Sequence, residues 1–198
     1  MITAVVVSLA FAASPFDDLK KPAAPVERLP STVAALVGVC PDGLDVDELE
    51  ECKKNLSTAA TKWKEKKIYI NLGAVEPNFL TFESKVGDTV RFVWAPLVDL
   101  GNGLALTVGK PDKLSPAGNV VVSRRPFEGP GDIEMFDTDL ARAAKTGTVG
   151  VEVVGVFGKP WQLNGKDKTV RGVSLELSAL RFYHTRTGKV LAEVTAVK

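Results

Sequence analysis

The sequence predicts a mainly β domain, at the margin of α+β, built as a small antiparallel barrel or sandwich behind an N-terminal helix. Three observations support this fold class. Apolar side chains recur every three or four residues over 46–63, as they do along one face of a helix. From Lys67 onward the apolar period falls to two, which is typical of strands with one buried face. Clusters of Gly, Pro, Asp and Asn separate these strands and favour turns.

The first residues have the pattern of a secretory signal peptide. Residues 1–12 form an uncharged apolar run with small side chains at Ala10 and Ala12, which suit a cleavage site. The run is shorter than the roughly 20 apolar residues that a membrane-spanning helix needs, and no later stretch qualifies. We predict that residues 1–12 are a signal peptide, cleaved after Ala12, and that the mature chain is periplasmic or secreted. The alternative is an apolar tail with no targeting role.

The next stretch is rich in proline. Residues 13–31 contain Pro15, Pro22, Pro25 and Pro30 among mixed polar residues. Proline fixes φ and lacks a backbone donor, so it disfavours helix interiors and strand ladders. We predict a Pro-rich linker that behaves as an extended tether.

Residues 32–66 are predicted to form a disulfide-linked helical segment. Asp45 and Asp47 are candidate N-caps for its helix, and lysines at the other end suit the negative pole of the helix dipole. The only cysteines, Cys40 and Cys52, are expected to pair in an exported chain, and this disulfide contributes about 3 kcal/mol in the chain-entropy model. The alternative is a pair of unpaired buried thiols in a cytosolic protein.

A β-rich domain is expected over residues 67–198, with one short helix between its strands. This helix is predicted over 137–145, where a capping residue precedes an alanine-rich stretch and Gly147 follows. The strands are predicted over residues 68–72, 79–83, 89–94, 104–108, 119–123, 133–136, 149–157, 172–183 and 190–197.

Two long strands change their apolar phase partway. The change falls at Val153–Val154 in the first strand and between Leu177 and Leu180 in the second, which predicts a bulge or sharp bend. Bent strands suit a sheet that closes into a small barrel or crosses between two packed sheets. The order of strands, short helix and long bent strands resembles an oligonucleotide/oligosaccharide-binding (OB-like) barrel, with a generic β-sandwich as the alternative.

The run VGDTVRF over residues 86–92 lies within a stretch that resembles the early hairpin of a cupredoxin. The resemblance covers residues 76–94 and implies a hairpin that enters a sandwich. A blue-copper site takes two His, a Cys and a weak axial ligand. The chain has one His and two cysteines that we expect to be paired, so we expect no metal and no cofactor.

The sequence offers little for catalysis. His184 is the only histidine, and it lies at the end of a predicted strand just before a turn. Glu134, Asp137 and Asp139 precede the predicted short helix, where acidic residues usually act as caps. We therefore assign no catalytic residues, and keep a hydrolase that uses these acidic residues on envelope polymers as an alternative.

The segment between the two long strands is the candidate contact surface. It places Trp161 among Lys159, Lys166 and Lys168, and Arg171 follows in the next strand. A tryptophan surrounded by cations can stack on a sugar ring or anchor a protein interface. In the alternative, Trp161 folds down to cap the barrel and the lysines only solvate the turn.

Charge excludes one class of partner. Lys and Arg number 25 and Asp and Glu 24, a formal net charge of +1, so no overall field attracts nucleic acid. We predict an exported, non-enzymatic β-rich module that binds another component of the cell envelope, either a protein or a glycan. A structural envelope domain without a small ligand is the alternative.

Overall fold

A mixed β-sheet forms the centre of the molecule, so the predicted mainly β class is confirmed. The computed structural model describes residues 14–40, 44–75, 80–86, 89–94, 97–122, 125–126, 142–143, 146–166 and 168–195. The seven-stranded sheet has the order β1-β2-β10-β11-β6-β5, and β12 pairs with β11. Its strands are β1 (Ala24–Pro25), β2 (Lys67–Ala74), β5 (Leu97–Gly101), β6 (Leu104–Val108), β10 (Val149–Asn164), β11 (Thr169–His184) and β12 (Val190–Thr195).

This sheet is neither fully antiparallel nor closed. β1 pairs in parallel with β2, and β6 with β11. Parallel strands cannot be joined by a tight hairpin, and other helices or strands lie between the members of each pair in the sequence. Within the described residues the end strands β1 and β5 do not pair with each other, so barrel closure is not seen.

Two smaller sheets accompany the central one. One contains β3 (Leu80–Val86), β4 (Thr89–Trp94) and β9 (Arg125–Pro126), and the other contains β7 (Lys113–Leu114) and β8 (Val120–Val121). β3 and β4 pair antiparallel over the cupredoxin-like run, so the expected hairpin is present.

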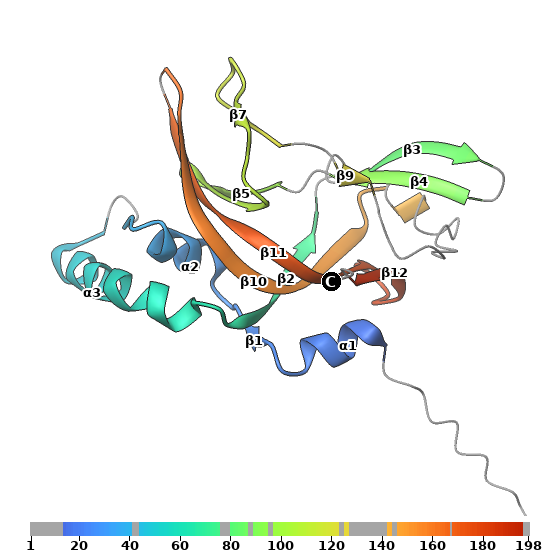
Figure 1. The fold of residues 1–198 in the computed structure, drawn as a ribbon, viewed down its shortest axis with the longest axis horizontal. Coiled ribbons are helices and arrows are strands. Elements are labelled where there is room, and N and C mark those ends of the chain that lie inside the picture. Colours follow the sequence, from blue (N-terminus) through green and yellow to red (C-terminus); the bar gives the residue numbers. More distant parts are fainter. Residues whose placement is uncertain are drawn as a thin grey trace, which may run out of the picture.

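The long β10–β11 hairpin organises the molecule and curves across it (Figure 1). A register shift skips Ser178, because Val154 pairs with Ala179 whereas Gly155 pairs with Leu177. This extra residue explains the predicted phase change in β11. A second shift lies between Phe157 and Pro160 of β10.

Apolar side chains cover both faces of this hairpin. Val151, Val153 and Phe182 belong to the main core, which also takes in side chains of α2 (Leu29–Leu36). Val154 faces the other way and packs against Phe16 of α1 (Pro15–Lys20). The apolar pair Val153–Val154 therefore reflects burial on both faces as well as the nearby bulge.

The predicted disulfide-linked helix is present as α3 (Val46–Trp63). Its N-terminus forms a capping box, in which the Glu48 amide donates to Asp45 Oδ1 at 2.8 Å and the Asp45 amide donates to Glu48 Oε2 at 3.2 Å. Cys40 and Cys52 are bonded, with their Cα atoms 5.9 Å apart. The disulfide joins the segment after α2 to the second turn of α3.

Residues 14–31, expected to be an extended tether, instead form α1, β1 and the start of α2. Pro15 and Pro30 lie in the first turns of their helices, where the missing N–H costs nothing and the fixed φ suits the helix. Phe16 is fully buried, so the segment packs onto the sheet.

Several predictions concern residues outside the described ranges. The signal peptide over 1–12 and the strand over 133–136 lie there, as do Glu134, Asp137 and Asp139. The short helix over 137–145 is described only at residues 142–143, which are helical.

Candidate functional site

The end of the β10–β11 hairpin extends beyond the strands that flank it. β2 accompanies β10 only as far as Val156, and β6 accompanies β11 only from Arg171 onward. Residues 164–166 and 168–169 therefore project from the sheet, beside the β7–β8 hairpin (Figure 1). The two hairpins touch, because a Cβ built at Gly165 would lie 3.1 Å from Leu114 Cδ1.

Trp161 lies at the base of this projection with its side chain turned inward. It is only 8% exposed, and its indole Nε1 donates to Thr107 Oγ1 at 3.0 Å. Thr107 is itself buried and donates onward to the Gly109 carbonyl oxygen at 2.8 Å. The indole lies across Gly172, the residue paired with it on β11, where an added Cβ would overlap the ring.

The indole belongs to a small apolar cluster that fixes the projection to the sheet. Ala105 and Val170 are buried with it, and half-buried side chains from β5, β7, β8 and β10 pack around them: Leu97, Leu114, Val120 and Leu163. The inward position expected in the alternative interpretation of Trp161 is therefore the observed one. The aromatic face is used for packing, and the exposed groups around it are polar or basic.

The four predicted cations occupy two positions along the hairpin. Lys166 and Lys168 are exposed at its end, and Arg171 lies just behind, half-buried, with Nε donating to Gln162 Oε1 at 3.0 Å. Lys159 is exposed farther back at the second register shift, where its carbonyl accepts from Ser174 Oγ at 3.0 Å. Among the described residues none of these four cations forms an ion pair with a carboxylate.

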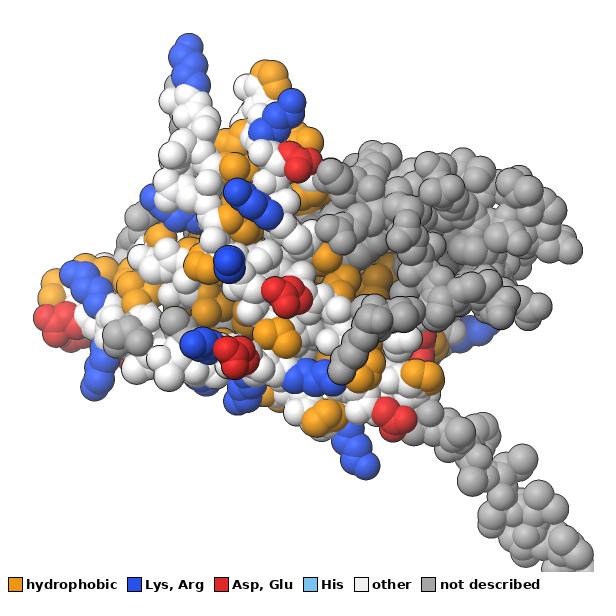
Figure 2. All heavy atoms as spheres, in the orientation of Figure 1, with side chains coloured by type: hydrophobic (Ala, Val, Ile, Leu, Met, Phe, Trp, Pro, Cys, Tyr) orange, Lys and Arg blue, Asp and Glu red, His pale blue; other side chains and the backbone are white. Residues whose placement is uncertain are grey.

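Figure 2 shows a basic side chain at the outer end of one upper projection and another just below the apolar tip of its neighbour. Lys113 of β7 is exposed and adds to the charge. The Lys168 side chain reaches the β7–β8 loop, because its Cδ lies 3.6 Å from a Cβ built at Gly118. We call Lys113, Lys159, Lys166, Lys168 and Arg171 the basic hairpin surface.

The other candidates for chemistry are not assembled into a site. His184 lies at the end of β11, where its Nδ1 accepts from the Arg186 amide at 3.3 Å, as a turn histidine does. In the described parts of the chain, no three His, Cys, Asp or Glu residues are grouped to hold a metal. Nor does any described helix combine the length and apolarity needed to cross a membrane.

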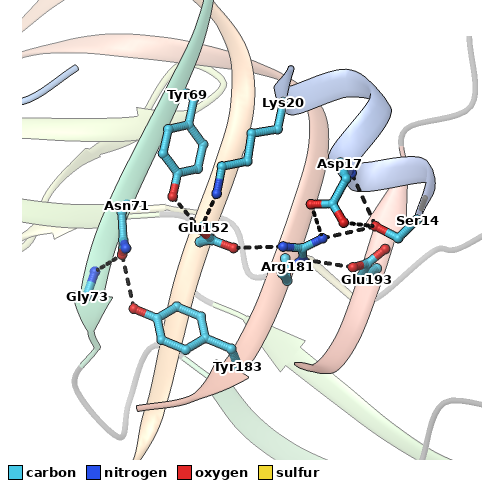
Figure 3. A network of polar contacts seen from close by, with 10 residues as sticks. All are labelled: Ser14, Asp17, Lys20, Tyr69, Asn71, Gly73, Glu152, Arg181, Tyr183 and Glu193. Atoms are coloured by element: carbon cyan, nitrogen blue, oxygen red, sulfur yellow. Dashed lines mark hydrogen bonds and ion pairs between the residues drawn. The ribbon is translucent and has the colours of Figure 1, made fainter. Parts of the chain in front are cut away.

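A polar network that the sequence analysis missed lies beneath α1 (Figure 3). Arg181 of β11 is its centre and is 8% exposed. Its guanidinium contacts Asp17 Oδ1 at 2.6 Å, Glu193 Oε1 at 2.7 Å and Glu152 Oε2 at 3.3 Å, and donates to Ser14 Oγ at 3.0 Å. One arginine thus joins α1, β10, β11 and β12.

Glu152 of β10 accepts from two further donors. Lys20 Nζ lies 2.8 Å from its Oε1, and the Tyr69 hydroxyl donates to the same oxygen. The Lys20 ammonium also lies 4.0 Å from the centre of the Tyr69 ring, and the Arg181 guanidinium lies 4.2 Å from the centre of the Phe16 ring. The two cations therefore hold both ends of α1 against the sheet.

The acidic and basic residues of this network stabilise one another's charged forms, whereas Tyr69 is kept in its neutral form. The hydrogen bond from Arg181 has the largest effect on Asp17 and lowers the pKa of its carboxyl. Burial alone would raise the pKa of Glu152, but hydrogen bonds from Lys20 and Tyr69, together with the positive charges of Lys20 and Arg181, outweigh it, so this pKa is lowered. Burial and the hydrogen bond to Glu152 raise the pKa of Tyr69. These satisfied groups stabilise the docking of α1, and we assign them no chemistry.

One sequence signal could have revealed the network. Glu152 and Arg181 interrupt runs of apolar residues in the middle of long strands, where an unpaired charge is costly. Such a pair predicts a buried ion pair across adjacent strands. The contribution of α1 has no comparable local signal, since Asp17 and Arg181 are 164 positions apart.

Comparison of the chain with known protein families, with curated proteins and with solved structures found no match.

Proposed function

We propose that the mature chain is an exported, non-enzymatic module that binds an anionic component of the cell envelope, protein or glycan, through the basic hairpin surface. One observation carries this proposal. The β10–β11 hairpin is anchored to the sheet and presents exposed lysines that form no ion pair among the described residues. A lysine that forms no ion pair within the chain does not have to break one when another molecule binds. Opposite charge on that molecule also speeds its association with the chain.

Export is supported by the apolar N-terminal run and by the Cys40–Cys52 disulfide, since disulfides persist mainly in oxidising compartments. The rigid base favours binding as well. Trp161 and its neighbours hold the hairpin end in one position, which reduces the entropy lost on association.

A structural envelope domain is the second candidate. One observation favours it, because the aromatic group best suited to contact a ligand, Trp161, is buried in packing. The two candidates differ in whether removing the hairpin charges changes what the chain binds.

The test is quantitative co-purification of tagged mature chain from the native envelope fraction. One variant carries Lys159→Gln, Lys166→Gln and Lys168→Gln. The charge-matched control carries Lys21→Gln, Lys53→Gln and Lys64→Gln, which are exposed residues of the N-terminal helical region. We expect partners to be lost from the first variant and kept by the control.

Equal partner sets for both variants would contradict the proposed surface, and an empty set for the unmodified chain would favour the structural candidate. A third variant, Trp161→Phe, is expected to keep its partners because the indole is buried.

A further inference from the structure

A second surface with the features of a ligand site lies between α2 and α3. A groove of about 450 Å³ opens there. Cavities that hold small ligands usually measure about 300 to 1,000 Å³. Its α2 wall includes Arg28, Ser31 and Thr32, and its α3 wall includes Asn55, Thr58 and Lys62.

The charges in the groove favour an anion. Arg28 and Lys62 enter from the two walls, and Glu27 is the one carboxylate in the lining. All three are exposed, and none of them forms an ion pair within the described part of the chain. An arginine and a lysine together suit a carboxylate, which a guanidinium can bind with two hydrogen bonds.

The remaining lining is suited to hydroxyl groups. Ser31, Thr32, Asn55 and Thr58 are short polar side chains, each able to donate and accept. The Thr58 hydroxyl donates to the Asn55 carbonyl oxygen at 3.1 Å, which leaves its own lone pairs to accept from a ligand. A bare anion would fill only a fraction of the volume and would leave these groups unused.

An aromatic side chain also lines the groove. Trp63 is 8% exposed and packs edge-on against Phe157, with ring centres 6.0 Å apart. Lys62 Nζ lies 5.1 Å from its ring centre, so cation and ring are adjacent. Lys66 Nζ lies 5.5 Å from the same ring centre, so the buried indole forms a fixed wall of the groove beneath two cations and is not itself a stacking surface.

The disulfide stabilises the groove. Cys40 follows α2, and Cys52 lies on α3 three residues before Asn55. The bond limits how far the two walls can separate, so the groove is preorganised.

We propose that this groove binds one acidic sugar unit, a hexuronic acid, with its carboxylate at Arg28 and Lys62 and its hydroxyls at the short polar side chains. This site is distinct from the basic hairpin surface and does not depend on it.

The test is a titration of the full mature chain with glucuronate, followed by NMR at the Trp63 indole N–H. Glucose, acetate and inorganic phosphate serve as probes that lack either the carboxylate or the hydroxyls. We expect saturable binding of glucuronate and binding at least tenfold weaker for each of the others. Arg28→Gln and Lys62→Gln should each weaken the binding of glucuronate about tenfold, whereas Lys53→Gln on α3 should not change its affinity.

Equal affinity for phosphate or acetate would overturn the sugar assignment, since it would show a simple anion site. Absence of a saturable shift at millimolar glucuronate would overturn the site itself. The variants replace exposed side chains and should keep the unfolding midpoint of the unmodified chain, which separates lost binding from lost folding. Reduction of the Cys40–Cys52 bond is expected to weaken the binding of glucuronate. The partners that bind through the basic hairpin surface should still be recovered.

Discussion

Arg181 is the residue whose contacts span most of the architecture. Its buried guanidinium balances Glu152 and connects two carboxylates from opposite ends of the chain, Asp17 and Glu193. Breaking a buried charge pair leaves the remaining charge without compensation, and this costs several kcal/mol.

We therefore predict that Arg181→Gln lowers the free energy of unfolding by about 3 kcal/mol, measured by urea denaturation. Lys20 and Tyr69 still compensate Glu152 in this variant, so the fold should survive. Arg186→Gln, in the exposed turn after β11, is the control and should change stability by less than about 0.5 kcal/mol. A loss as small as that of the control would contradict the assigned role of Arg181.

A substitution at Gly172 tests the inward position of the Trp161 indole. A methyl group at Gly172 would meet both the indole and the Ala105 carbonyl oxygen, and the carbonyl cannot move without disturbing the sheet. We expect Gly172→Ala to destabilise the protein by about 2 kcal/mol and to make Trp161 more accessible to an acrylamide quencher. Glu176→Ala, exposed on the same strand, should do neither. Unchanged stability in Gly172→Ala would place the indole elsewhere.

At the scale of elements, α1 is held by groups that titrate. Asp17 and Glu152 have pKa values below their ordinary values of 3.8 and 4.5. A lowered pKa in the folded state means that the ionised carboxylates stabilise the docked helix at every pH above their ordinary pKa values. This stabilisation is lost as the pH falls through the lowered values.

Acidification below about pH 4 should therefore release α1 before the sheet unfolds. NMR amide shifts of residues 17–20, followed down from neutral pH, should move toward coil values in that range, while amides of the central strands β10 and β11 keep their native shifts. Retention of the docked helix well below this range, or its release near neutrality, would contradict the assigned network.

The disulfide stabilises the α2–α3 pair. Replacing both cysteines, Cys40→Ser with Cys52→Ser, should lower the free energy of unfolding by about 3 kcal/mol, because the open chain gains entropy when it unfolds. Urea denaturation of this variant and of the reduced natural chain should agree. A variant as stable as the oxidised chain would contradict a stabilising role.

At the scale of the whole molecule, local patterns predicted the elements better than their arrangement. The helical spacing of Leu49, Leu56 and Trp63 predicted α3, and the shifted phase between Leu177 and Leu180 predicted the irregularity at Ser178. Both signals arise from neighbouring residues that share one buried face.

The open, mixed sheet and the docking of α1 could not be predicted in the same way. The parallel pairing of β6 with β11 joins segments far apart in the chain, and no local periodicity records it. Phe16 appears as part of a tether until the sheet that buries it is present. The sequence singled out Lys159, Lys166, Lys168 and Arg171 as cations close to a tryptophan. It missed Lys113 of β7 and the inward turn of Trp161, which depends on Thr107 and Gly172.

The central claim is that the chain binds its partner through the hairpin end. A photo-crosslinking amino acid placed at Lys166, at the tip, and separately at Lys53, on α3, tests this in the native envelope. The proposed function predicts a discrete adduct from position 166 and none from position 53. Equal adducts from both positions, or none from position 166, would contradict it.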